Sequence, residues 1–199
     1  MRWCGYHHKE CPPDCFYLQL ADAFREEYDE VESSGQVITL KSLAGNRISN
    51  KELRGSKLAI DCNLEELESS LSGVLEDLKR DGRRWVVILK SVAAPVRYVQ
   101  VLVTQEGGLW AECVSNAFLS PEEQFRDEQL ELLPLLGWQW PSPPAGPNWQ
   151  FHDELLNTGS AISHLLMRTL REVFGYATND HVEFVLFLSQ KNVTLNGEH

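Results

Sequence analysis

The fold is decided by the stretch YVQVLVTQEGGLWAECVS, which runs from Tyr98 to Ser115. Apolar and polar residues alternate on both sides of Glu106-Gly107-Gly108, a sequence typical of a tight turn between two strands. A nearly all-apolar run from Trp85 to Lys90 precedes this stretch and predicts a third strand. Parallel pairing would need a crossover of about a dozen residues, and the connections here are shorter. The three strands therefore predict an antiparallel β-meander.

Two strong helical patterns lie on either side of the meander. Asn63, followed three residues later by Glu66, predicts a capped helix start, and apolar residues then keep helical spacing as far as Asp81-Gly82. Thr158 predicts the start of a second helix, which Gly175 ends. The apolar positions of this second helix are Ile162, Leu165, Leu166, Thr169, Leu170 and Val173.

The segment between these helices carries weaker signals. Ser120-Pro121-Glu122-Glu123 combines an N-cap residue, a first-turn proline and acidic residues, so it predicts a helix that kinks or ends just before Pro134. Residues 141–147 contain four prolines and predict a stiff loop. The run from Val182 to Leu188 is too apolar for a water-facing edge and predicts a closing strand. Together the patterns predict an α+β fold, with an antiparallel β-meander flanked by helices.

The first sixty residues differ from the rest of the chain. An acidic helix is predicted over Phe16 to Glu32, and short strands over Gln36 to Ser42 and near Arg47 to Asn50. We therefore expect residues 1–60 to form an N-terminal arm or small subdomain, residues 61–190 to form the main α+β domain, and residues 191–199 to form a tail.

Charge excludes one class of partner. Residues 61–199 hold 20 acidic and 10 basic residues, so −10 of the formal net charge of −11 lies there. Nucleic-acid binding requires a basic surface, which this half lacks. The dense basic run from Lys79 to Arg84 is interpreted as a solvated turn between a helix and a strand. The sequence also shows no apolar window of membrane-spanning length and no signal peptide, so we expect a cytoplasmic protein with no membrane partner.

A metal site is one interpretation of the N-terminus. Cys4, His7, Cys11 and Cys15 supply thiols and an imidazole at spacings that can surround a tetrahedral zinc ion. Such a structural zinc would contribute on the order of 10 kcal/mol to ordering the arm. The alternative is a terminus whose cysteines are accidental or are exposed reactive thiols. Two further cysteines, Cys62 and Cys113, lie in patterned segments and are expected to be reduced and buried.

Catalysis has little support in the sequence. It contains no nucleophile elbow, phosphate loop, H-E-x-x-H or paired-carboxylate motif. His152-Asp153, His164 and the pair His181 and Glu183 are interpreted as polar surface residues. We therefore expect no catalytic residues and predict a protein that is not an enzyme.

Four tryptophans fall on the meander and on the loop after it. Rigid aromatic side chains beside a sheet can anchor a peptide, but they can also fill the core where a loop folds back. We assign Trp138 and Trp149 to the core and leave both interpretations open for Trp110 and Trp140. The alternation of the meander places Gln100 and Glu112 in series with aromatic residues, as on a half-exposed sheet face.

A series of short motifs follows in a characteristic order and spacing: YVQ at 98–100, AE-VSN at 111–116, LGW at 136–138, NW at 148–149 and TLREVFG at 169–175. With these motifs, the region from about Asn63 to Leu188 resembles a bacterial family, the TY-Chap peptide-binding chaperone-like domains, named for type III secretion chaperones and YbjN. The resemblance implies a secretion-chaperone-like α+β fold and binding of an extended polypeptide without ATP. It transfers no catalytic residues.

Three functional hypotheses follow, from different classes. The first is a chaperone-like adaptor, expected as a homodimer, that holds a peptide segment of a partner such as a secreted effector or a toxin-like protein. Its candidate peptide-binding residues are Tyr98, Gln100, Trp110, Glu112 and Trp140. The second is an immunity or antitoxin-like protein that neutralises a toxin by binding it. A small enzyme that uses the cysteine- and histidine-rich arm is a third class, which metal analysis would test.

Overall fold

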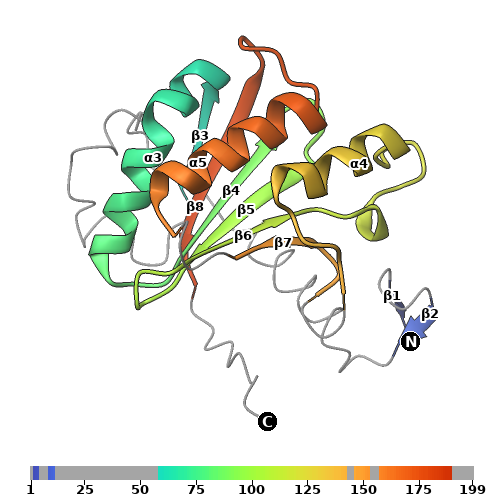
Figure 1. Ribbon diagram of the computed structural model, residues 1–199, viewed down its shortest axis with the longest axis horizontal. Coiled ribbons are helices and arrows are strands. Elements are labelled where there is room, and N and C mark those ends of the chain that lie inside the picture. The colour runs from blue at the N-terminus through green and yellow to red at the C-terminus, as the bar shows by residue number, and fades with distance from the viewer. Residues whose placement is uncertain (1, 5–8, 12–57, 143–145, 153–156, 190–199) are drawn as a thin grey trace.

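The computed structural model describes residues 2–4, 9–11, 58–142, 146–152 and 157–189. Its main feature is a six-stranded sheet in which every neighbouring pair is antiparallel. The strand order is β3-β8-β4-β5-β6-β7 (Figure 1). The strands are β3 (Leu58–Asn63), β4 (Trp85–Ser91), β5 (Tyr98–Val103), β6 (Leu109–Cys113), β7 (Trp149–Phe151) and β8 (His181–Leu188).

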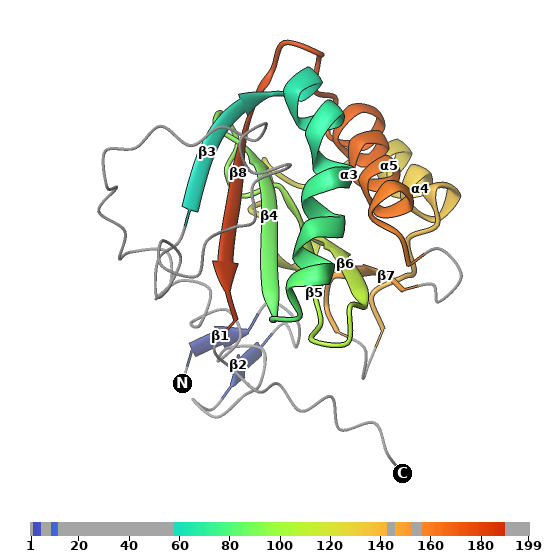
Figure 2. The ribbon, with the colours of Figure 1, turned by 90° about the vertical axis from the view of Figure 1, so that its left-hand side faces the viewer.

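The helices α3 (Leu64–Asp81), α4 (Asp127–Leu136) and α5 (Gly159–Arg168) lie together on one face of this sheet (Figure 2). α5 continues into a π-helical segment, η2 (Thr169–Val173), and a short 3-10 helix, η1 (Asn116–Phe118), follows β6. The predicted α+β class and the antiparallel meander are therefore confirmed. A separate two-stranded sheet pairs β1 (Arg2–Cys4) with β2 (Lys9–Cys11).

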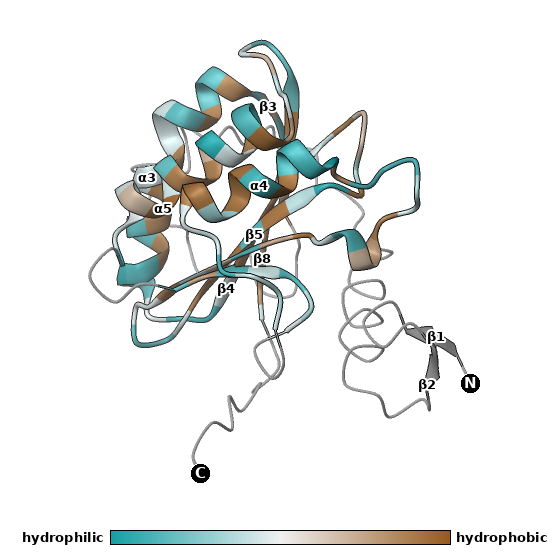
Figure 3. Ribbon diagram, turned by 45° about the vertical axis from the view of Figure 1, so that its right-hand side comes forward, coloured by the Kyte–Doolittle hydropathy of each residue, from teal (hydrophilic) through white to brown (hydrophobic). Residues whose placement is uncertain are grey.

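The main core lies between the sheet and the helix layer. α3 and α5 carry both hydrophobic and hydrophilic residues, as amphipathic helices that cover a core do (Figure 3). Each buried leucine contributes about 1.5–3 kcal/mol of transfer free energy. The fully buried leucines of α3 are Leu64, Leu67, Leu71, Leu75 and Leu78. They face the buried side of the strands, including Val87, Val101 and Phe184.

Both ends of α3 form as the sequence predicts. The Asn63 side chain accepts a hydrogen bond from the Glu66 amide at 2.8 Å, which satisfies one of the unpaired N–H groups at the helix start. Gly82 ends the helix with φ of 69°, a left-handed conformation that glycine adopts at little cost. Thr158 caps α5 in the same way, by accepting from the Ala161 amide at 3.1 Å. β8 lies between β3 and β4, so its predicted interior position is confirmed.

The predicted helix start at Ser120 is wrong. Residues Ser120 to Glu123 form a turn, in which the Glu123 amide donates to the Ser120 carbonyl at 2.9 Å. The Glu123 carbonyl accepts from Arg97 Nε at 2.9 Å, so it is engaged by a distant side chain and not by a following helical turn. The helix starts at Asp127, where the Arg126 amide donates to Gln129 Oε1 at 3.0 Å.

α4 does not end just before Pro134, which is one of the two outcomes that the sequence predicts. The helix passes through it to Leu136, and the left-handed Gly137 then stops it. The Trp138 amide donates back to the Leu133 carbonyl at 3.1 Å, and both side chains are buried, as in a Schellman end with its hydrophobic contact. This closure compensates for the one helical hydrogen bond that the proline cannot make.

In the six-stranded sheet, β3 and β7 have no counterpart among the sequence-predicted strands, and neither do β1 and β2 of the separate sheet. The π-helical segment η2 replaces the end of the expected regular helix. The elements predicted over residues 16–32, 36–42 and 47–50, and residues 143–145 of the proline loop, lie outside the described residues. The division at residues 60 and 190 stays a prediction. β3 begins at Leu58 and pairs along its whole length with β8.

The basic run from Lys79 to Arg84 lies at the end of α3 and in the turn to β4, with Arg83 paired to Asp81. This agrees with the predicted turn between a helix and a strand, but Lys79 is not fully solvated, because its Nζ donates to the Asn157 carbonyl at 2.6 Å. Within the described ranges, no helix is both long enough and apolar enough to cross a bilayer.

Candidate functional site

The outer face of the sheet is the face turned away from α3, α4 and α5 (Figure 2). Side-chain alternation along the strands sorts their residues between this face and the core. An apolar cluster of Val86, Ile88 and Val185, with Leu102 and Phe187 beside it, forms the part over β4, β5 and β8. Polar side chains form the part over β5, β6 and β7.

The polar part is a hydrogen-bonded cluster, which we call the Glu112 cluster: Tyr98, Gln100, Glu112 and Asn148. Gln100 and Glu112 are direct cross-strand partners, and Gln100 Nε2 donates to Glu112 Oε2 at 2.7 Å. Asn148 Nδ2 donates to the same oxygen at 3.3 Å and lies 3.4 Å from the Tyr98 hydroxyl. Gln100 and Asn148 are buried, whereas Tyr98 and Glu112 remain partly exposed. The cluster therefore reaches from the buried sheet to its surface.

The electrostatics of Glu112 are unusual for an acidic residue. Burial raises the pKa of its carboxyl group, and the hydrogen bonds from Asn148 and Gln100 only partly offset this effect. No ion pair to Glu112 forms within the part of the chain that the structure describes. Lys90, on the same face, lies 2.7 Å from Glu183 instead. The carboxylate is thus held by amides alone.

Aromatic side chains frame the Glu112 cluster. Trp110 lies two residues before Glu112 on β6 and stacks on the exposed His152 ring, with 4.6 Å between ring centroids. Trp140 is 62% exposed and packs on the buried Trp149 at 4.4 Å. Trp138 is only 2% exposed. The core assignment of Trp138 and Trp149 is confirmed, whereas Trp140 is exposed and Trp110 is partly exposed.

The motif residues of the sequence have identifiable structural roles. Trp138 Nε1 donates to Thr169 Oγ1 at 2.9 Å, and that hydroxyl donates to the Leu165 carbonyl at 2.8 Å, so LGW and TLREVFG meet in the core. Asn148 of NW accepts from the Ser115 amide of AE-VSN at 3.2 Å. Since its amide nitrogen also bonds Glu112, Asn148 joins the scaffold to the outer face.

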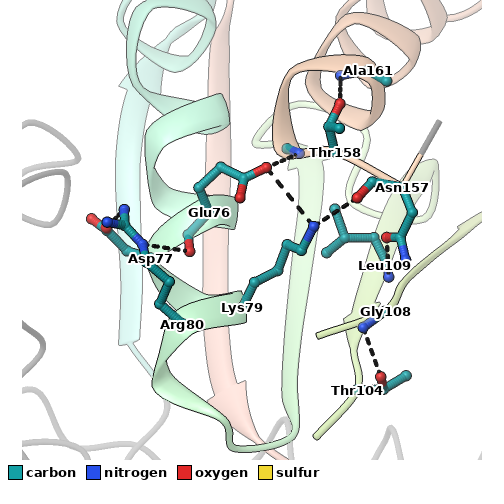
Figure 4. Close-up of polar contacts among 11 residues, drawn as sticks. Glu76, Asp77, Lys79, Arg80, Thr104, Gly108, Leu109, Asn157, Thr158 and Ala161 are labelled. Carbon is teal, nitrogen blue, oxygen red and sulfur yellow. Dashed lines mark hydrogen bonds and ion pairs between the residues drawn. The ribbon is translucent and has the colours of Figure 1, made fainter. Parts of the chain in front are cut away.

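A brace between α3, β6 and α5 fixes the start of β6 (Figure 4). Lys79 Nζ donates to the Asn157 carbonyl at 2.6 Å, and Asn157 Oδ1 accepts from the Leu109 amide at 2.8 Å. The Glu76 carboxylate accepts from the Gly159 amide at the start of α5. The brace sets the strand that carries Trp110 and Glu112 against the helix layer.

The structure brings four of the five predicted peptide-binding residues, Tyr98, Gln100, Trp110 and Glu112, onto one sheet face. Trp140 lies beyond the edge strand β7, near Trp149. The sequence-based prediction did not include Asn148, which reaches the cluster from a loop 36 residues after Glu112. Its only sequence signal was its place in the NW motif.

The metal site at the N-terminus stays a prediction. Cys4 and Cys11 lie in β1 and β2, with Cys4 opposite Lys9 and Cys11 opposite Arg2, whereas His7 and Cys15 lie outside the described residues. Within the described residues, no group of three or more His, Cys, Asp or Glu side chains could hold a metal ion.

The remaining cysteines, Cys62 and Cys113, are free and buried as expected. Burial raises the pKa of the Cys62 thiol to about 12, and nearby Glu66 and Asp61 contribute. Burial also raises the pKa of Cys113. Both thiols are therefore weak nucleophiles at neutral pH.

Fold and site together define a small α+β protein whose described residues place helices on one sheet face and a polar and aromatic surface on the other. The chain belongs to the family described as T3SS (YopN, CesT) and YbjN peptide-binding chaperone 3, TY-Chap3, which matches residues 63–186. The family expected from the motifs is thus confirmed. Comparisons with curated proteins and with solved structures gave no match.

Proposed function

We propose that this chain is a non-enzymatic, chaperone-like adaptor that binds a peptide segment of a partner protein on the outer face of its sheet. Membership of a peptide-binding chaperone family supports the class of function. The observation that carries the location is the convergence of Tyr98, Gln100, Trp110 and Glu112 on one face that none of the described helices covers. An extended segment can lie along such a surface and place alternate side chains against it.

Trp110 provides the most direct test, because it is an aromatic anchor whose removal leaves the core intact. The full chain would be purified without a tag from its native host, and co-purifying polypeptides identified by mass spectrometry. We expect one polypeptide to be recovered with the wild type and lost with Trp110→Ala. The matched control is Leu135→Ala, which removes a large apolar side chain that is 78% exposed on α4, in the helix layer. Equal recovery with all three proteins would refute the proposed surface.

Identity of the recovered polypeptide decides between the two hypotheses. A secreted effector supports the chaperone-like adaptor, and a toxin whose activity falls on binding supports the immunity or antitoxin-like alternative. The homodimer and the cytoplasmic location stay predictions. Structural zinc at Cys4, His7, Cys11 and Cys15 is a separate proposal, which the zinc content of the purified chain and of Cys11→Ser would test.

A further inference from the structure

We infer that the bound polypeptide presents a basic side chain, lysine or arginine, to the carboxylate of Glu112. This inference rests on the proposed function and adds the chemistry of the residue that the outer face recognises. It is carried by the arrangement of acceptors and charges in the Glu112 cluster.

Two acceptor atoms of the cluster lack a donor. Gln100 and Asn148 both donate to Oε2 of Glu112, so Oε1 has no hydrogen-bond partner among the described residues. Oε1 of Gln100 is buried and also lacks a partner in the described part of the chain. A buried acceptor without a donor is unfavourable, because it has lost its hydrogen bonds to water. Lysine and arginine side chains carry only donors, so either one suits the Oε1 atom of Glu112.

The charges around Glu112 also favour a basic side chain in the bound polypeptide. Glu112 is a partly buried carboxylate on the acidic part of the chain, and Lys90, a lysine of the outer face, is paired with Glu183 at 2.7 Å. Since burial raises the pKa of Glu112, ionising it without a cation is unfavourable. A basic side chain from the partner would offset this cost through a charge-assisted hydrogen bond.

Trp110 adds a second contact of suitable chemistry. It lies two residues from Glu112 on the same strand and on the same face, which is about 7 Å along the strand. Aromatic rings attract lysine and arginine through cation–π contacts, and the methylene groups of these side chains pack on the ring. An extended segment lying along β6 would therefore place its basic residue at Glu112 and a neighbouring residue at Trp110.

A peptide library separates this inference from the proposed function. The full chain would be used to select from a random nine-residue displayed library, in three forms: wild type, Glu112→Gln and Glu106→Gln. Glu106 lies in the exposed β5–β6 turn, so this control removes the same charge away from the outer face. We expect wild type and Glu106→Gln to enrich peptides with lysine or arginine at a fixed position, and Glu112→Gln to lose that preference.

A second measurement needs no protein variant. The best selected peptide would be titrated into the wild-type protein by calorimetry, with its basic residue either retained or replaced by norleucine. Loss of the cation should weaken binding by about tenfold or more, because a desolvated charge pair is broken. Selected peptides without a basic preference, or a preference that Glu112→Gln retains, would overturn the inference and leave the proposed function standing. Failure of the wild type to enrich any peptide would overturn both.

Discussion

Gly159→Ala tests the contact between α3 and α5 that supports the site. Gly159 is the first residue of α5, and a Cβ atom built on it would lie 2.6 Å from the Ser72 carbonyl oxygen and 3.0 Å from Glu76 Cγ. The first contact is to backbone of α3, which cannot rotate away. The two helices must therefore separate, or α5 must shift, before an alanine fits.

Two opposing effects decide whether Gly159→Ala raises or lowers the free energy of unfolding. Alanine is favoured over glycine within a helix by about 1 kcal/mol. Overpacking costs about 1–3 kcal/mol, and moving α5 also stretches the hydrogen bond from the Gly159 amide to the Glu76 carboxylate, a charged bond worth about 1.5–3 kcal/mol. The clash and the stretched bond outweigh the propensity gain, so we expect a net loss of about 1–3 kcal/mol in the free energy of unfolding.

Urea denaturation followed by circular dichroism measures this loss. In a thermal melt, a chain of this length loses about 2–4 °C in melting temperature per kcal/mol, so the melting temperature should fall by several degrees. The control is Ser160→Ala, the next residue of α5, which is exposed and should be neutral or stabilising by about 0.5 kcal/mol. A Gly159→Ala protein as stable as Ser160→Ala would refute the close packing of α3 on α5.

Three further outcomes are expected. Thr169→Val keeps the branched shape but leaves the buried Trp138 Nε1 without an acceptor, so the free energy of unfolding should fall by about 1–3 kcal/mol. An unchanged urea denaturation curve would contradict the hydrogen bond. Because burial raises the pKa of Glu112 above its ordinary value, the native state binds that proton more tightly than the unfolded chain. Wild-type stability should therefore rise relative to Glu112→Gln as pH falls from 7.5 towards 5, and a constant difference would argue against the raised pKa. Iodoacetamide at pH 7.5 should label Cys62 and Cys113 only after denaturation, as measured by peptide mass spectrometry.

Local patterns predict the parts of this fold that local interactions determine. The cap at Asn63, the stop at Gly82 and the turn at Gly107 each depend on a few neighbouring residues, and each forms as predicted. Ser120 shows the limit of this reasoning. The residues of its helix-start signature form only a single turn, because the side chain of distant Arg97 donates to the Glu123 carbonyl, which a continuing helix would use.

β3 and β7, the unpredicted strands of the six-stranded sheet, differ in how clearly the sequence indicates them. β3 alternates between exposed and buried positions, with Ile60 and Cys62 facing the core, so its pattern was available in the sequence. β7 has only three residues and follows a proline-rich loop. Its identity as a strand depends on pairing with β6, 36 or more residues earlier, which no local pattern reveals.

Local sequence predicts some features of the candidate site, and other features depend on the whole fold. Alternation along β5 and β6 is enough to place Tyr98, Gln100, Trp110 and Glu112 on one face. The register that makes Gln100 and Glu112 direct partners depends on the turn between the strands, where the Thr104 amide donates to the Gly108 carbonyl at 2.8 Å. The contribution of Asn148 depends on the whole fold.

If its only role were to stabilise the fold, the Glu112 cluster would be an unfavourable arrangement. A polar network of this kind contributes most when every donor and acceptor is satisfied, and a half-satisfied one is less favourable than apolar packing. Here two amides converge on one oxygen of Glu112, while Oε1 of Gln100 is buried without a donor in the described part of the chain. A cationic side chain from the bound segment would pair with the carboxylate of Glu112. In the proposed mode of binding, the cluster would lower the stability of the free protein and contribute to affinity and selectivity for the bound segment.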